Sequence, residues 1–193
     1  MEKLLITAFG DAGAGKGTNL GMVALAFGCV VVDMGDKLRE KAVERGLSLH
    51  ELHELMLGDR SVDDELDEYV RRLPEQHERL IISSRTAWFL HPKSTRIYLA
   101  CREVVTALRI SLREGVTSSQ ALIKERARVA VDADRYRQFL GIETYPPPHD
   151  LFDIVVDTSN LSPGEVQARL IEQLTPLVGP YAPSPPSRPS LRV

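Results

Sequence analysis

The chain has little of several features that mark whole classes of protein. Among its 193 residues are only two cysteines, Cys29 and Cys101, which lie far apart and stand in or beside apolar runs. This spacing fits neither a metal site nor a small disulfide-stabilised scaffold, so both side chains are expected to be buried thiols. A reducing, cytoplasmic location is the expectation that follows.

Long apolar segments and an excess of basic charge are missing as well. The longest apolar run, 20–32, is interrupted by glycines and is shorter than the roughly 18 residues that a membrane span needs. The first residues lack the length and the cleavage site of a signal peptide. The formal net charge of −3 gives no support for nucleic-acid binding. We expect a monomer whose partners are small molecules, without a membrane or nucleic-acid partner.

The chain does contain five short apolar runs that alternate with helical patterns. The runs are continuously apolar, as in strands that are covered on both faces. Capping-box or similar patterns that begin at Ser48, Ser61, Thr117 and Ser162 predict helix starts. This alternation predicts an α/β fold with a parallel sheet between two layers of helices. The predicted strands are 4–9, 29–33, 79–83, 95–100 and 152–157.

Two insertions and a tail complete the predicted organisation. Three charged helices occupy 36–73, and a charged helical stretch with the loop "TYPPPHD" occupies 117–149. We predict one domain, 1–178, with its core at 1–35, 74–116 and 150–178. The proline- and serine-rich tail, 179–193, is expected to be disordered or extended, with a docking peptide as the alternative.

The stretch "GDAGAGKGT" carries the strongest chemical signal. Glycines let successive backbone N–H groups converge on a phosphate, and the positive end of a following helix adds to this attraction. A flexible linker is the alternative, but linkers rarely lie between a buried strand and a helix, here predicted at 16–27. We predict binding of ATP, with Mg²⁺ placed by the hydroxyl of Thr18. The predicted loop comprises Gly10, Asp11, Ala12, Gly13, Ala14, Gly15, Lys16, Gly17 and Thr18.

The order of residues in this loop narrows the class of phosphate-binding protein, because Gly17 separates Lys16 from Thr18. This order resembles that of the nucleoside monophosphate kinases. Over 4–174, the segments are similar to those of cytidylate kinases of the archaeal and cytidylate-kinase-like branch. The matching segments are "VDMGDKLREKAVERGLSLHEL", "SVDDELD", "IISSRTAWFL", "LREGVTSSQALIKERARVAVDADRYRQFLGI" and "FDIVVDTSNLSPGEV". The resemblance implies a three-layer P-loop fold with a five-stranded parallel sheet, a helical acceptor-binding insertion at 36–73 and a lid at 117–149. It also implies transfer of the ATP γ-phosphoryl group to CMP or dCMP.

The same resemblance implies roles for individual residues. Lys16 is expected to hold the β- and γ-phosphates of the donor. Arg39 and Arg85, with Asp36 beside them, are expected to bind the acceptor, since a guanidinium matches phosphate in a bidentate fork. The lid arginines are expected to close over the transferring group and exclude water. The candidates are Arg126, Arg128 and Arg135; the resemblance favours the first and the last, although the seven-residue spacing places Arg128 and Arg135 on one helical face.

Each of these residues also has a purely structural interpretation. A lid arginine can be a solvated surface residue, and Asp36 can be the cap of the helix that it opens. Trp88 fits the core better than it fits base stacking. The segment 158–160 is either a plain turn or, as the resemblance implies, a loop beside the donor base. The five histidines show no catalytic partner and are expected at the surface.

Departures from the family pattern leave other functions open. Ser83 and Ser84 replace the usual acidic residue and glycine before Arg85, and Asp33 is a candidate substitute acting on Mg²⁺ through water. Asp11 replaces a more usual proline and sets a carboxylate near the triphosphate, which is mildly unfavourable. The alternatives are a kinase for another acceptor (AMP, UMP or a nucleoside) and a nucleotide-binding regulatory protein.

Overall fold

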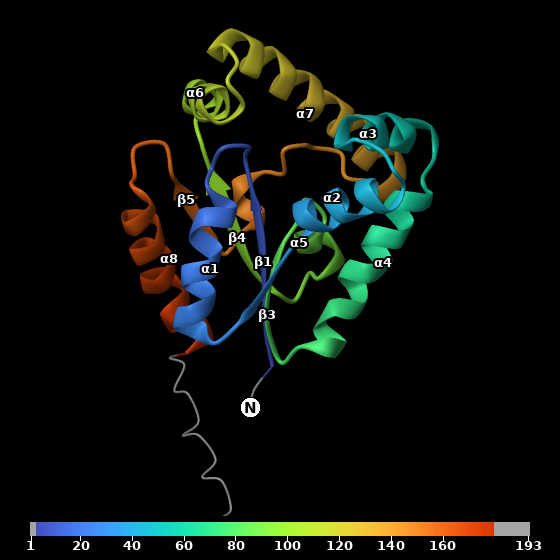
Figure 1. Cartoon of the computed structure of the whole chain (residues 1–193). Helices are drawn as coiled ribbons and strands as arrows, with labels where there is room; N and C mark the ends of the chain where they lie inside the picture. The colour runs from blue at the N-terminus through green and yellow to red at the C-terminus, as the bar shows by residue number, and fades with distance from the viewer. Residues whose placement is uncertain (1–2, 180–193) are drawn as a thin grey trace, which may run out of the picture.

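The centre of the molecule is a five-stranded parallel sheet in the order β2-β3-β1-β4-β5. The computed structural model describes residues 3–179, and Figure 1 shows the sheet between layers of helices. All five predicted strands are confirmed, with ends that shift by at most two residues. The strands are β1 (Leu4–Gly10), β2 (Val30–Asp33), β3 (Arg79–Ser83), β4 (Thr95–Ala100) and β5 (Ile154–Asp157).

Helices α1 (Lys16–Phe27) and α8 (Pro163–Val178) cover one face of the sheet. Alternate residues of β1 point to this face, so Ile6 and Ala8 pack there with Leu20 and Leu170. These four side chains are almost completely buried and belong to the largest apolar cluster. The continuously apolar strands are thus explained, because the next residues along β1 are buried on the opposite face.

The opposite face is covered by α4 (Ser61–Gln76), α5 (Ala87–Leu90) and the segment that leads into β5. Phe9, Tyr98 and Phe152 form an aromatic cluster there with Trp88. Trp88 is 6% exposed and donates its indole N–H to the carbonyl oxygen of Arg85. The core interpretation of Trp88 is therefore confirmed, and the ring is not available to stack on a base.

The two predicted insertions lie at the carboxyl end of the sheet (Figure 1). The first contains α2 (Met34–Glu44), α3 (Leu49–Gly58) and α4. The second follows α6 (Glu103–Glu114) and consists of α7 (Ser118–Leu140), which packs on α6, and a loop with the 3-10 helix η1 (His149–Leu151). The domain boundaries assigned to these insertions remain a prediction. No helix within 3–179 is long and apolar enough to cross a membrane.

The helix starts follow the capping patterns in three of four cases. Ser48, Thr117 and Ser162 each form a capping box with the residue three positions later. Ser61 was predicted to cap α4, but this is wrong: Ser61 is already helical, and its N–H is held by the carboxylate of Asp59. The predicted tail, apart from Gly179, lies outside the described residues.

Candidate active site

One large cavity, about 1930 Å³ in volume, opens at the carboxyl ends of β1, β2 and β3. All nine predicted loop residues, Gly10 to Thr18, line it, and so do the acceptor and lid arginines. Strand β1 is the point at which the chain changes direction across the sheet, because its neighbours β3 and β4 both come later in sequence. Ligands of open parallel sheets bind outside such a point, so the topology and the motif agree.

The glycine loop folds as a cradle between β1 and α1. Gly13 and Gly15 have φ angles of 69° and 82°, a region that residues with a side chain rarely adopt. Gly10 has a different reason: a Cβ there would lie 2.7 Å from the carbonyl oxygen of Leu99. The glycines therefore serve loop conformation and close packing, and the N-terminus of α1 points its free N–H groups at the cavity.

Lys16 lies deep in this cradle and bends back over the loop. Its ammonium group donates to the carbonyl oxygens of Gly10, at 2.6 Å, and of Asp11, at 3.3 Å. Burial, together with the positive charge of Arg85, lowers the pKa of Lys16 to about 8, against the opposing effect of nearby carboxylates. The ammonium group contacts only carbonyl oxygens, so a bound phosphate would be its first directly contacting negative charge.

Helix α6 holds the loop from the other side, through residues that the sequence analysis did not single out. The hydroxyl of Thr106 donates to the carbonyl oxygen of Ala12 at 2.8 Å. The guanidinium of Arg109 donates to the carbonyl oxygens of Gly13, at 2.9 Å, and Thr158, at 2.7 Å. Thr106 and Arg109 are three residues apart and so share one helical face, the only sequence signal that could have suggested them.

The segment 158–160 contains a turn, and two of its three residues are buried. Thr158 is 1% exposed and donates its hydroxyl to the carbonyl oxygen of Ala100. Ser159 accepts from the N–H of Arg102, whose guanidinium reaches Asn160. Through Arg109 this turn is joined to the glycine loop, which keeps open the prediction that it borders the donor base.

The carboxylate of Asp11 is not directed freely at the expected triphosphate. Its two oxygens accept hydrogen bonds of 2.8 Å from the hydroxyl of Tyr98 and from the N–H of Cys101. The expected repulsion is thereby reduced, because both donors withdraw charge from the carboxylate. Cys101 is buried, as predicted, whereas Cys29 is only half-buried.

The candidate acceptor side begins where β2 ends. Asp33, not Asp36, caps α2, accepting from the N–H groups of Gly35 and Asp36. The other carboxylate oxygen of Asp33 accepts from the hydroxyl of Ser83 at 2.8 Å. The capping interpretation of Asp36 is therefore wrong. Asp36 lies outside the lining of the cavity and pairs with Arg39, so its contact with an acceptor stays a prediction.

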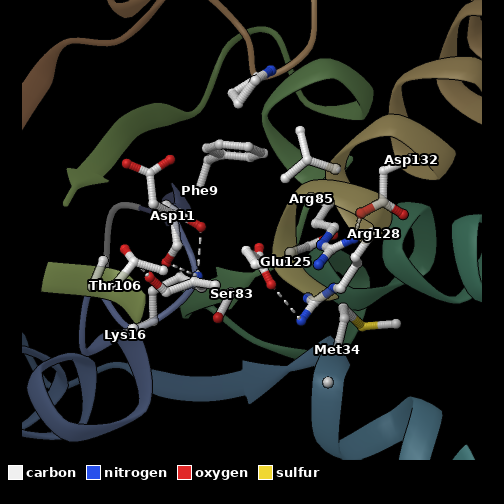
Figure 2. A pocket seen from close by; sticks show the side chains of 18 of the residues that line it. Phe9, Asp11, Lys16, Met34, Ser83, Arg85, Thr106, Glu125, Arg128 and Asp132 are labelled. Atoms are coloured by element: carbon white, nitrogen blue, oxygen red, sulfur yellow. Dashed lines mark hydrogen bonds and ion pairs between the residues drawn. The ribbon is translucent and has the colours of Figure 1, made fainter. Parts of the chain in front are cut away.

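Arg85 extends from the end of β3 towards the lid and forms an ion pair with Asp132 of α7. Asp132 is 4% exposed, so this pair links the sheet to the lid through a buried carboxylate. Figure 2 shows Arg85 and Asp132 together on the side of the cavity opposite Lys16. A guanidinium that faces the same space as the loop lysine is suitably placed to bind a second phosphate.

The three candidate lid arginines all line the cavity but have different partners. Arg126 forms two 2.6 Å hydrogen bonds with Glu103 of α6. Arg128 lies 3.6 Å from Glu125 on its own helix. Arg135, 9% exposed, pairs with Asp63 of α4 and so connects the lid to the first insertion. The interpretation of the lid arginines as freely solvated thus fails for Arg135.

Glu125 is a site residue that the sequence analysis missed. It projects from α7 into the cavity, and in Figure 2 it lies between Lys16 and Arg128. Burial raises the pKa of its carboxyl, while the charges of Arg85 and Lys16 act in the opposite direction. In the ligand-free protein, the carboxylate of Glu125 therefore faces the positive charges of Lys16 and Arg85.

Comparison with known proteins agrees with this geometry. The family model described as "AAA domain" matches residues 9–115. The cytidylate kinase of Haloquadratum walsbyi is 33% identical over 165 residues, which cover 84% of this chain and 85% of that protein. The chain belongs to the cytidylate kinase family. A second relative in this family, the cytidylate kinase of Natronomonas pharaonis, is 32% identical over 182 residues, with 93% and 92% of the two chains covered.

Solved structures show that the family fold is shared with other P-loop kinases. An uncharacterised protein from Eubacterium ventriosum has a TM-score of 0.65 at 14% identity, covering 88% of this chain and 97% of that one. Shikimate kinase from Bacteroides thetaiotaomicron has a TM-score of 0.61 at 13% identity, covering 91% and 98%. Membership of the cytidylate kinase family makes this chain an ATP-dependent phosphotransferase of the nucleoside monophosphate kinase type.

Proposed function

We propose that the protein transfers the γ-phosphoryl group of ATP to CMP or dCMP and so forms ADP and CDP or dCDP. The observation that carries the choice of acceptor is the identity of 32–33% with two cytidylate kinases across almost the whole domain, including the acceptor-side insertion. The geometry supports a two-nucleotide reaction, because Lys16 and Arg85 face one cavity from the segments that follow the adjacent strands β1 and β3.

The donor occupies the glycine loop in this proposal. Backbone N–H groups of the loop and the N-terminus of α1 bind the β-phosphate, and Lys16 bridges to the γ-phosphate. Thr106 and Arg109 donate hydrogen bonds to two loop carbonyl oxygens and so keep these oxygens turned away from the phosphates. The loop is thereby held in its binding conformation before the nucleotide arrives.

The acceptor phosphate lies between the ends of β2 and β3, where Arg39 and Arg85 bind it. An oxygen of this phosphate attacks the γ-phosphorus, the bond from that phosphorus to the β-γ bridging oxygen breaks, and ADP leaves with the electron pair. Negative charge spreads over the transferring group, so closely placed cations are the main catalytic requirement. Arg126, Arg128 and Arg135 of the lid supply this charge and exclude water, which would otherwise be the acceptor.

The residues at the loop fit Mg²⁺, although 3–179 contains no cluster of three or more His, Cys, Asp or Glu side chains that could hold a metal. Mg²⁺ prefers oxygen ligands and is usually held by one or two side chains together with phosphates and waters. Thr18 offers a hydroxyl, and Asp33, supported by Ser83, offers a carboxylate. The ion would neutralise phosphate charge there.

A coupled assay of ADP release over CMP, dCMP, UMP and AMP tests the proposal. We expect CMP and dCMP to give the highest kcat/KM. Preferential turnover of AMP or UMP would contradict the proposed acceptor without affecting the family assignment. Nucleotide binding with no turnover of any acceptor would instead support a regulatory role.

A further inference from the structure

The acidic helix "SVDDELD" has two carboxylates that line the active-site cavity, Asp63 and Asp67. They lie four residues apart on α4 and so share one helical face. Asp63 is engaged by Arg135 of the lid. Asp67 accepts a 3.0 Å hydrogen bond from the hydroxyl of Thr86, and no other described residue donates to it. Asp67 is therefore the acidic group on this wall that has no cationic partner in direct contact.

Thr86 fixes where Asp67 stands relative to the acceptor. It directly follows Arg85 in sequence and is 7% exposed, so the carboxylate of Asp67 is held beside the end of β3. The Arg85 side chain itself pairs with Asp132 on the lid. Asp67, on the first insertion, and Arg85 therefore line one cavity, with Asp67 held by the residue that follows Arg85.

The part of the cavity formed by α2, α3 and α4 is of mixed character. Leu38, Met56, Leu66 and Val70 line it together with polar side chains such as Arg60 and Asp63. The Asp67 side chain is partly buried, and this burial raises the pKa of its carboxyl. Apolar walls with a few well-placed polar groups are the usual design of a site that selects a ligand by its hydrogen bonds.

We propose that Asp67 selects the acceptor base, its carboxylate accepting an N–H from the exocyclic amino group of cytosine. This inference rests on the proposed function. A uracil places a carbonyl oxygen where cytosine has its amino group, and two acceptors facing each other in a poorly solvated site repel. Leaving a buried polar group unpaired strongly disfavours the wrong substrate. Thr86 acts as a positioning residue, because its hydroxyl fixes the orientation of the carboxylate.

The test is Asp67→Asn, because an amide of the same size offers an N–H to the carbonyl oxygen of uracil. We measure kcat and KM for CMP and UMP with ATP held saturating. The ratio of kcat/KM for CMP over UMP should fall at least tenfold, mainly through the KM values, with the KM for ATP unchanged. Glu68→Gln on the exposed face of the same helix is the matched control and should leave the ratio unchanged.

A second variant and a second pair of acceptors keep the test decisive. Thr86→Val keeps the carboxylate but removes its positioning donor, so it should shift the ratio in the same direction by a smaller factor. AMP and IMP differ in the same amino and carbonyl groups. If the wild type prefers AMP, the proposed CMP specificity fails, while a change in the AMP-to-IMP ratio in Asp67→Asn still supports the role of Asp67. If neither ratio changes in Asp67→Asn, the inference is wrong.

Discussion

Asp11, the second residue of the glycine loop, is held by the hydroxyl of Tyr98 on the neighbouring strand β4, across 2.8 Å. The two residues are 87 positions apart in the sequence. The second oxygen of Asp11 accepts from the N–H of Cys101, so one side chain attaches the loop both to β4 and to the residue that follows this strand. A loop that must present N–H groups to a phosphate is thereby fixed at its entrance.

This arrangement predicts that Asp11→Asn destabilises the protein. The amide can accept at only one of its two terminal atoms, so either Tyr98 or Cys101 loses its acceptor. We expect a loss of about 1–3 kcal/mol in the free energy of unfolding, measured by urea denaturation. Asp134→Asn on the exposed lid surface is the control. Equal stability of the two variants would show that the Asp11 contacts contribute little.

Lys16→Met should reduce kcat by at least about 10²-fold, because the lysine neutralises charge on the transferring group. The variant should unfold as cooperatively as the wild type, since Lys16 contacts only loop carbonyls. The measurement is ADP release together with a denaturation curve. Lys93→Met, on the exposed surface, controls for the loss of one positive charge. Near-normal turnover of Lys16→Met would remove this lysine from the mechanism.

The lowered pKa of Lys16 predicts a pH dependence of nucleotide binding. A lysine whose pKa is about 8 in the free protein loses its charge as the pH rises through that value. A bound triphosphate raises this pKa, so the affinity for ATP should fall roughly tenfold between pH 7 and pH 9. The sign for folding is opposite: the unfolded chain retains the proton up to a pKa near 10.5, so this group adds stability as the pH rises from about 8 towards 10.5.

Calorimetric titration with a non-hydrolysable ATP analogue measures the affinity, and unfolding curves over the same range measure the stability. Lys16→Arg keeps its charge at every pH used and should bind without this decline. A wild-type affinity that stays constant up to pH 9 would contradict the buried position of the ammonium group.

Arg85→Lys should weaken use of the acceptor while leaving donor use intact. Lysine retains the charge but not the planar fork that binds two phosphate oxygens at once. We expect the KM for the acceptor to rise about tenfold and the KM for ATP to stay unchanged in steady-state kinetics. Arg72→Lys, in an exposed pair with Glu68, is the control. If the KM for the acceptor is unchanged in Arg85→Lys, Arg85 does not belong to the acceptor site.

The pair formed by Arg135 and Asp63 should contribute far more to stability than a surface pair. The Arg135 side chain is 10% exposed and that of Asp63 19%, so removing one partner leaves a buried charge. Arg135→Met should cost about 3 kcal/mol in the free energy of unfolding. A double-mutant cycle with Asp63→Asn measures the coupling.

The exposed pair of Arg137 and Asp134, on the same helix, is a matched control for this cycle. Its coupling should be below about 1 kcal/mol. Similar coupling energies for the two pairs would show that the lid is not held to the first insertion by Arg135.

The sheet and the glycine loop were predictable because their signals are local. A continuously apolar run followed by "GDAGAGKGT" determines a strand, a turn and a helix start within 27 residues of the N-terminus. Capping boxes are equally local, and three of four were placed correctly. The cap of α2 was missed because Asp33 was interpreted as a strand end, although its side chain reaches forward to Gly35.

The cavity partners could not be predicted, because they join distant segments. Nothing near Arg85 in the sequence points to Asp132, and nothing near Arg135 points to Asp63. The spacing within α7 indicates only which of its arginines share a face of the helix. Which other helices pack against that face depends on the topology of the chain. Glu125 was missed for the same reason, since a glutamate on a charged helix is ordinarily solvated.

The pairing of the cavity arginines has a consequence for how the protein discriminates among anions. Arg85, Arg126 and Arg135 each have a carboxylate partner from another element in the ligand-free molecule. A lone sulfate or inorganic phosphate can compete for one such partner at a time and gains little by displacing it. The bound donor and acceptor together carry several phosphates, which can replace all three carboxylate partners at once. At these three arginines the ligand-free protein therefore favours a ligand with several phosphates over a single small anion.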